Sequence, residues 1–296
     1  MMKKINVYKF VYLGIVVSLL CGCMGCTQAT IDASASPFQT TLYVGGSGPG
    51  NYSTIGEALV AAVNGDIIYV YDDSSPYLEN VLVTKQVEIF GENPETTVVD
   101  GNGTGNVFTL ATDLITISGF TIENGIAGIY IDIHSNITLS ENIIQDNTAE
   151  GIRFYGEANN NLITGNTIIN NGDCGIHFSS FSDYNIISNN YIGQNLNGTE
   201  LNAYANGEIT GNTFEENTEY ALTMVLWCNQ NKIRFNNFMS NGNDVMFFTS
   251  VLNSWLFNYW DRPHLLPKPI FGVQGPIPWV NFDWRPLLSP HTPLTE

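Results

Sequence analysis

Three short segments of similar sequence carry a tyrosine, an arginine and a histidine at the same position. The segments are residues 128–131, 151–154 and 175–178, and the side chains are Tyr130, Arg153 and His177. Each segment alternates with period two, which is typical of a β-strand with one buried face. If the preceding isoleucines point inward, an aromatic ring, a cation and an imidazole line one outer column on consecutive coils of the chain.

This column has neighbours that extend it in both directions. Two positions further along the three segments lie Asp132, Tyr155 and Ser179, and the alternation predicts that later coils continue the column through Asn202, Thr223 and Phe247. A long strip with a small axial repeat suits an extended glycan, because aromatic faces stack on sugar rings while polar groups bond their hydroxyls. The expected ligand-binding residues are Tyr130, Arg153, Tyr155 and His177.

Two other interpretations of the strip remain open. In a catalytic one, Arg153 or His177 acts as the base and Asp132 binds calcium. In the plainest one, the strip is an ordinary solvent-facing sheet.

The elements that would position the strip come from an internal repeat. Six similar segments recur at steps of 22, 24, 24, 22 and 24 residues, and they begin at Thr121, Ile143, Thr167, Tyr191, Thr213 and Asn237. No window has an apolar period of 3.6, and the coils lack the leucine spacing of leucine-rich repeats. These features predict an all-β fold, a single-stranded right-handed parallel β-helix with coils of about 22–24 residues.

Asparagine occupies two equivalent positions in these repeats. Coils of a β-helix lie about 4.8 Å apart, so in-register amides bond those above and below. We expect two structural ladders, Asn142, Asn166, Asn190, Asn212, Asn236 and Asn147, Asn171, Asn195, Asn217, Asn241.

The ends of the chain differ from the repeat. A capping box at Thr54 and Glu57 predicts a helix through Val63 that covers the open end of the core. After residue 253 the chain becomes rich in proline and tryptophan, which predicts an aromatic C-terminal cap or a sugar-stacking platform. The predicted organisation is a signal peptide (1–22), a tether (23–40), the β-helix (41–253) and the cap (254–296).

The first residues indicate export. Three lysines precede an apolar run of about ten residues, which is typical of a secretory signal peptide. The run ends in Leu20-Cys21-Gly22-Cys23, which resembles a lipobox and implies a lipid anchor on Cys23, placing the protein at the outer face of the cell membrane. Cleavage near Ala29 or Ala35 is the alternative, and Cys26 is a second candidate anchor.

Composition narrows the partners. With 10 Lys and Arg against 28 Asp and Glu, the net charge of −18 repels nucleic acid and anionic lipids. Outside the leader only Cys174 and Cys228 remain, so we expect no disulfide framework and no metal site. We predict a monomer without a cofactor that contacts the membrane only through its lipid.

The opening of the repeat domain resembles prokaryotic surface proteins of the pectin-lyase-like superfamily. The residues concerned are 48–55, 65–66, 68–70, 91–92 and 100–101. The Asn-rich coils resemble NosD-type and carbohydrate-binding or sugar-hydrolase-type repeats, and Asn258-Tyr259-Trp260 resembles the signature that closes NosD-type repeats. The resemblance implies the β-helix fold, which hosts lyases, hydrolases, epimerases and adhesins.

The resemblance also frames the functional alternatives. Lyases of the superfamily use calcium and a catalytic Arg or Lys, and of the hydrolase signatures only Asp72-Asp73 is present. We therefore predict a non-catalytic, surface-anchored protein that binds carbohydrate or another surface polymer. The alternatives are a polysaccharide lyase or glycoside hydrolase, in which calcium is the possible cofactor, and a NosD-like accessory protein for copper-enzyme maturation. Copper binding lacks support in the residues, because His134, His177, His264 and His291 are far apart in sequence.

Overall fold

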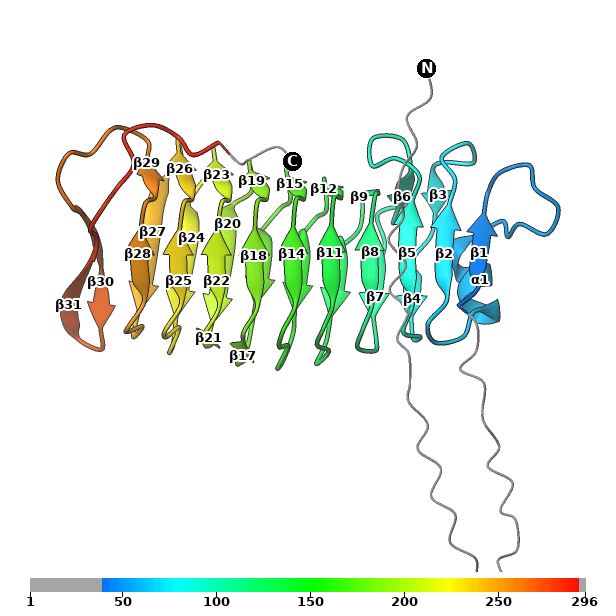
Figure 1. Ribbon diagram of the computed structural model, residues 1–296, viewed down its shortest axis with the longest axis horizontal. Helices are drawn as coiled ribbons and strands as arrows, with labels where there is room; N and C mark the ends of the chain where they lie inside the picture. Colours follow the sequence, from blue (N-terminus) through cyan, green and yellow to red (C-terminus); the bar gives the residue numbers. More distant parts are fainter. Residues whose placement is uncertain (1–38, 293–296) are drawn as a thin grey trace, which may run out of the picture. The chain divides into compact units, whose positions relative to one another are not determined.

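The computed structural model describes residues 39–292, which form a parallel β-solenoid of about ten turns (Figure 1). The predicted signal peptide, the Cys23 anchor and almost all of the tether lie outside the described residues. Within 39–292 no helix is long and apolar enough to cross a membrane.

Three faces of parallel strands build the solenoid. Each coil between residues 67 and 274 contributes one strand to each face, and the second face has one further strand at each end. The first face is formed by β4 (Val81–Val83), β7 (Phe108–Leu110), β10 (Ile129–Ile131), β13 (Ile152–Phe154), β16 (Cys174–Phe178), β20 (Asn197–Asn202), β24 (Tyr220–Val225), β27 (Asn243–Phe248) and β30 (Lys268–Gln274). The three sequence segments that opened the analysis are therefore the first-face strands β10, β13 and β16.

The second face contains one strand per coil that the sequence analysis did not single out within the repeats. It is formed by β1 (Thr41–Val44), β2 (Ile67–Val70), β5 (Glu88–Gly91), β8 (Thr116–Ser118), β11 (Thr138–Ser140), β14 (Leu162–Thr164), β18 (Ile186–Ser188), β22 (Glu208–Thr210), β25 (Lys232–Arg234), β28 (Ser254–Leu256) and β31 (Ile277–Asp283). These strands escape notice because only two residues separate most of them from the strand that follows, as between Ser140 and Ile143, so that the two strands resemble one segment in the sequence.

The third face corresponds to the repeated segments. It is formed by β3 (Tyr77–Leu78), β6 (Val98–Asp100), β9 (Thr121–Glu123), β12 (Ile143–Gln145), β15 (Thr167–Ile169), β19 (Tyr191–Gly193), β23 (Thr213–Glu215), β26 (Asn237–Met239) and β29 (Tyr259–Trp260). Two short strands in the turns, β17 (Ser182–Asp183) and β21 (Tyr204–Ala205), pair separately at the lower edge in Figure 1.

Identical residues stack in the core along the axis. The rings of Phe154 and Phe178 are parallel with centroids 4.2 Å apart, and Phe214, Phe238 and Trp260 form a second continuous stack. Each ring buries its faces against the coils above and below, which gives apolar burial and offset stacking at once.

Both sets of expected asparagines lie in register and bond from coil to coil. In the first ladder, for example, Asn166 Nδ2 donates to Asn190 Oδ1 at 3.0 Å, and the backbone N–H of Asn166 donates to the same oxygen at 2.9 Å. The second set repeats this geometry from Asn147 to Asn241. These buried amides thus satisfy the turn backbone that would otherwise lack partners.

A third ladder was not anticipated. Asn161 donates to Asn185 at 2.9 Å and Asn231 to Asn253 at 3.1 Å, but the coil between them carries Gly207. The ring of Tyr204 fills the space that a side chain on Gly207 would need, and its hydroxyl donates to the carbonyl of Asn185 at 2.8 Å. The interruption hid this ladder in the sequence.

The helix α1 (Ile55–Ala61) lies at the N-terminal end and packs against β1, β2 and β4. As the capping box predicts, Thr54 Oγ1 accepts a hydrogen bond from the Glu57 backbone N–H at 3.1 Å. The helix ends at Ala61, two residues before the predicted limit, and the Asp66 carboxylate accepts from the N–H of Val63 beyond it.

The solenoid continues past residue 253, so the predicted boundary falls inside the last coil. β28 and β29 pair in parallel with the preceding coil, and only then do β30 and β31 form an antiparallel hairpin. Buried Asp283 ends the first ladder, because its Oδ2 accepts from Nδ2 of Asn258 at 3.0 Å and from Nε1 of Trp260 at 3.1 Å. An acceptor-only carboxylate is the group that the last donating amide needs. Of the predicted platform tryptophans, Trp255 is also buried, whereas Trp279 and Trp284 are exposed.

Candidate functional site

The strand register places the predicted strip on the outer side of the first face. Tyr130, Arg153 and His177 are direct neighbours on β10, β13 and β16. The next residues in this register are Glu200 on β20 and Thr223 on β24. We call these five residues the outer strip. Tyr155, Ser179 and Asn202 follow two positions later in the same strands or just beyond them and form the flanking column.

Two residues predicted for the column lie elsewhere. Asn202 stands two positions away, in the flanking column, because a two-residue slip of register keeps every side chain on its own face and so leaves the alternation unchanged. The prediction of Phe247 was wrong by one residue, and a shift of one residue along a strand moves a side chain to the opposite face of the sheet. Met246 is the neighbour of Thr223, whereas Phe247 is fully buried in the core.

Glu150 organises the centre of the strip, although it lies in the turn before β13. Its side chain is only 4% exposed, and its Oε1 accepts a hydrogen bond from Nη1 of Arg153 at 2.6 Å and faces Nδ1 of His177 at 3.4 Å. Burial alone would raise the pKa of Glu150, but the hydrogen bond from His177, its own backbone N–H and the charge of Arg153 outweigh burial and lower the pKa. Glu150 is therefore a buried carboxylate that holds both side chains in place.

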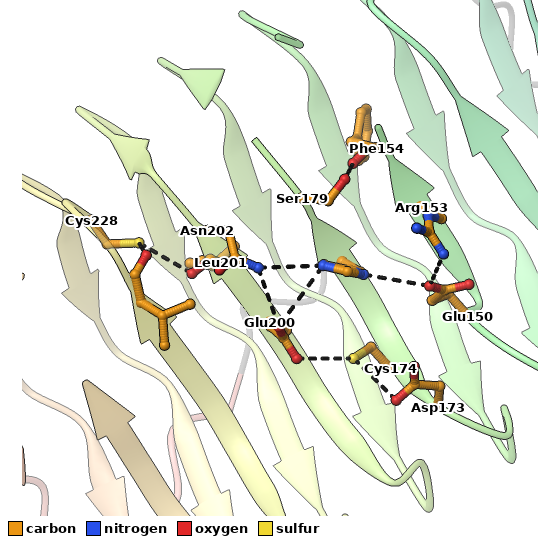
Figure 2. Close-up of polar contacts among 12 residues, drawn as sticks. Glu150, Arg153, Phe154, Asp173, Cys174, Ser179, Glu200, Leu201, Asn202 and Cys228 are labelled. Atoms are coloured by element: carbon orange, nitrogen blue, oxygen red, sulfur yellow. Dashed lines mark hydrogen bonds and ion pairs between the residues drawn. The ribbon is translucent and has the colours of Figure 1, made fainter. Parts of the chain in front are cut away.

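The other side of the imidazole faces Glu200 and Asn202. Asn202 Nδ2 lies 3.4 Å from Nε2 of His177 and donates to Oε1 of Glu200 at 3.2 Å, while this carboxylate lies 3.9 Å from Nε2 (Figure 2). The carboxylate beside Nδ1 is an acceptor and the amide beside Nε2 is a donor, so the two ring nitrogens face partners of opposite kind. His177 is thus fixed from both sides.

Cys174 lies at the edge of this cluster. Its Sγ is 3.6 Å from Oδ1 of Asp173 and 3.7 Å from Oε2 of Glu200 (Figure 2). Burial, followed by the charges of these carboxylates, raises the pKa of the thiol. Cys174 is therefore a protonated thiol and a poor nucleophile. Cys174 and Cys228 are both free.

The aromatic part of the site comprises Tyr130 of the outer strip and Tyr155 of the flanking column. Their rings lie 6.4 Å apart with planes 24° from parallel, and the Arg153 guanidinium carbon is 5.8 Å from the Tyr155 centroid. Burial and then the Asp132 carboxylate raise the pKa of Tyr130, so its hydroxyl remains a neutral donor and acceptor. Asp132 itself is exposed at the end of β10.

The polar residues that the sequence analysis missed, Glu150 and Glu200, share one signal. Each lies one or two positions from a column of glycines, Gly151, Gly175 and Gly198, which stack so closely that a Cβ on Gly175 would approach the carbonyl oxygen of Gly198 to 2.7 Å. Aligning the coils on these glycines rather than on the alternation places Glu200 after His177.

Comparisons with known proteins agree with this architecture. A family model described as periplasmic copper-binding protein (NosD) matches residues 58–265. Among solved structures, XylC in complex with xylose is similar with a TM-score of 0.63 and 13% identity over 74% of this chain and 65% of that chain, so this chain spans slightly less than two thirds of that length. At this identity the likeness concerns the fold, and it confirms the predicted parallel β-helix.

Two further structures are similar at lower scores. They are an alginate lyase from Paenibacillus sp. str. FPU-7, with a TM-score of 0.48, 15% identity and coverage of 73% and 95%, and the pectate lyase Pel9A, with a TM-score of 0.46, 10% identity and coverage of 77% and 65%. No curated protein matches this chain in sequence.

The copper named in the family description does not fit the side chains present. Within residues 39–292, no group of three or more His, Cys, Asp or Glu side chains is arranged to hold a metal ion. His134 pairs with Asp113 at 3.2 Å, His291 lies against Phe235, and His177 is held by carboxylates and an amide. Asp132, the predicted calcium ligand, belongs to no such group in this part of the chain. No step of the proposed function passes through a metal.

Proposed function

This chain belongs to the NosD family, and we propose that it binds carbohydrate on the outer strip and the flanking column without cleaving it. The family is described as periplasmic, which supports export. A lipid anchor on Cys23 and a position at the cell surface are parts of the same proposal. They would hold the binding face outside the membrane, where polysaccharides are present.

The observation that carries the proposal is the pairing of aromatic and polar groups along one register. Tyr130 and Tyr155 offer ring faces, while Glu200 and Asn202 offer acceptors and donors in a single coil, two coils beyond that of Tyr155. Sugars need both kinds of contact, since their C–H faces are apolar and their edges carry hydroxyls.

The contacts of the candidate catalytic groups favour binding over cleavage. Arg153 donates to Glu150, and the same carboxylate faces Nδ1 of His177, so both side chains are already engaged in the unliganded protein. A guanidinium paired at 2.6 Å with a buried carboxylate is a fixed donor rather than a free base.

One specific feature supports a second candidate, acid–base catalysis. His177 lies between Glu150 and Glu200, and its Nε2 faces the more exposed of the two carboxylates. A histidine oriented by one carboxylate is the usual arrangement of a general base. If this arrangement is catalytic, the protein releases reducing ends from a polysaccharide, and His177→Ala abolishes the release while leaving the fold intact.

The primary test measures retention of the protein in native gels that contain soluble xylan, β-glucan or polygalacturonate. We expect retention by at least one polymer, and we expect Tyr155→Ala to weaken it about tenfold, which corresponds to about 1.4 kcal/mol. Phe271→Ala is the matched control, because Phe271 is an exposed aromatic residue on the C-terminal hairpin, away from the strip. Equal retention of wild type and Tyr155→Ala in every gel would contradict binding at the strip.

A further inference from the structure

Two exposed aromatic side chains stack on each other in the turns that follow the first face. Phe181 follows β16 and is 56% exposed, and Trp227 follows β24 and is 54% exposed. Their centroids are 6.1 Å apart and their planes differ by 12°. Large aromatic rings are normally removed from water, so a nearly parallel, stacked pair that remains exposed calls for an explanation.

The backbone at Trp227 is strained in a way that holds the ring outward. Leu226 and Trp227 have φ values of +53° and +64°, so two consecutive non-glycine residues adopt the left-handed conformation. This conformation costs roughly 1 kcal/mol or more per residue. The N–H of Leu226 donates to Phe248 O at 3.0 Å and that of Trp227 to Thr249 O at 2.8 Å, and these bonds to the next coil offset the strain.

The coil between the two rings leaves room for them to approach. Phe181 and Trp227 belong to coils two steps apart, which at about 4.8 Å per step separates their backbones by roughly 10 Å. The intervening turn carries Ala203, whose side chain is short, and Tyr204, whose ring points into the core. The two rings stack on each other across this coil and form one exposed aromatic cluster.

This surface lies directly beside the proposed binding face. Asn202 immediately precedes Ala203 in the chain, and Asn202 contacts both His177 and Glu200. Two acidic residues lie close to the pair along the chain, since Asp183 is two residues after Phe181 and Glu200 is two residues before Asn202. Carboxylated sugars would meet repulsion here, whereas neutral sugars would not.

We propose that Phe181 and Trp227 form a stacking platform for a neutral pyranose polymer, such as a xylan or a glucan, that also reaches the strip. The C–H face of one sugar ring lies on the aromatic surface, while its hydroxyls bond Asn202 and Glu200. The inference rests on the proposed function and adds to it the stacking subsite and the uncharged class of ligand.

The test uses isothermal titration of the full protein with xylohexaose, cellohexaose and an oligogalacturonate. Trp227→Ala is expected to weaken binding of the neutral hexasaccharide about tenfold, and Trp227→Phe to restore most of it, because a ring face is retained. Tyr43→Ala is the matched control, since Tyr43 is also an exposed aromatic residue but lies on β1 at the N-terminal end of the solenoid. Circular dichroism melting of each variant checks that the fold is kept.

The outcomes separate this inference from the proposed function. One outcome is that the wild type binds a neutral hexasaccharide, that Tyr155→Ala weakens this binding and that Trp227→Ala leaves it unchanged. This outcome overturns the platform but leaves binding at the strip intact. If no saccharide binds the wild type, both are overturned. Binding of the oligogalacturonate alone overturns the neutral class. A wild-type dimer in light scattering that Trp227→Ala makes monomeric, with saccharide affinity unchanged, overturns the platform in favour of a self-association surface.

Discussion

Asn190 is the position at which the first asparagine ladder is most completely defined. Its buried side chain accepts at Oδ1 from the N–H and Nδ2 of Asn166, and it donates from Nδ2 to Ile163 O at 2.9 Å and to Asn212 Oδ1 at 3.0 Å. In Asn190→Ala the backbone N–H of Asn166 loses its acceptor inside the core, which costs about 1–3 kcal/mol. The other partners keep second bonds, since Asn166 Nδ2 still reaches Leu139 O. We expect a total loss of about 2–4 kcal/mol in the free energy of unfolding.

The assay is urea denaturation followed by circular dichroism, combined with amide hydrogen exchange, because a solenoid need not unfold in one step. Exchange at the Asn166 amide is expected to accelerate more than exchange in distant coils. Asn243→Ala is the control, since the exposed Asn243 makes one side-chain bond, to Glu219 O, and its loss is expected to cost less than about 0.5 kcal/mol. If Asn190→Ala and Asn243→Ala unfold at the same urea concentration, buried amide pairing does not stabilise the coils.

Three further predictions concern other parts of the chain. Asp283→Ala leaves the terminal donors of Asn258 and Trp260 unpaired, so we expect a lower melting temperature, with partial recovery in Asp283→Asn; equal melting of all three proteins would refute this role. The lowered pKa of Glu150 means that it stabilises the fold above its unfolded pKa, near 4.5, and ceases to do so as the pH falls through its folded value. In urea denaturation at neutral pH, the free energy of unfolding of the wild type should therefore exceed that of Glu150→Gln by about 1–2 kcal/mol, and this difference should decrease below pH 4.5. A difference that does not change with pH would contradict the assignment. Cys23→Ser should move the protein from the detergent phase to the aqueous phase in Triton X-114 partitioning of cells, and unchanged partitioning would exclude Cys23 as the anchor.

The solenoid was predictable because its signal is repeated in every coil. Steps of 22 and 24 residues, in-register asparagines and alternating apolar residues all indicate one architecture, and such agreement across levels is typical of a well-specified fold. The second face and the third ladder were missed for a local reason in each case. Most second-face strands are only two residues from the strand that follows and merge with it in the sequence, and Gly207 with Tyr204 interrupts the ladder.

The site was harder to predict because its residues do not repeat. The sequence brought Tyr130, Arg153 and His177 together, but it gave Asn202 the place of Glu200. In most coils, the first inward-facing residue of the first-face strand lies five positions after the asparagine of the second ladder, as Ile176 does after Asn171. In the coil of Asn195, Thr199 comes one position early and Leu201 one late. The alternation allows either Thr199 or Leu201 to be aligned with Ile176, and the greater hydrophobicity of leucine favours Leu201.

Close packing of the glycine column settles this choice, and the consequence reaches the site. The carbonyl of Gly198 lies where a Cβ on Gly175 would clash, so only a glycine-sized residue suits the position before Ile176. That contact aligns Gly198 with Gly175, turns Thr199 inward and leaves Glu200 beside His177. The ladders fix one corner of each coil and the glycines fix another, so residues without a role in binding determine which side chains face the ligand. A substitution such as Gly198→Val should therefore displace Glu200 and weaken binding without touching a sugar.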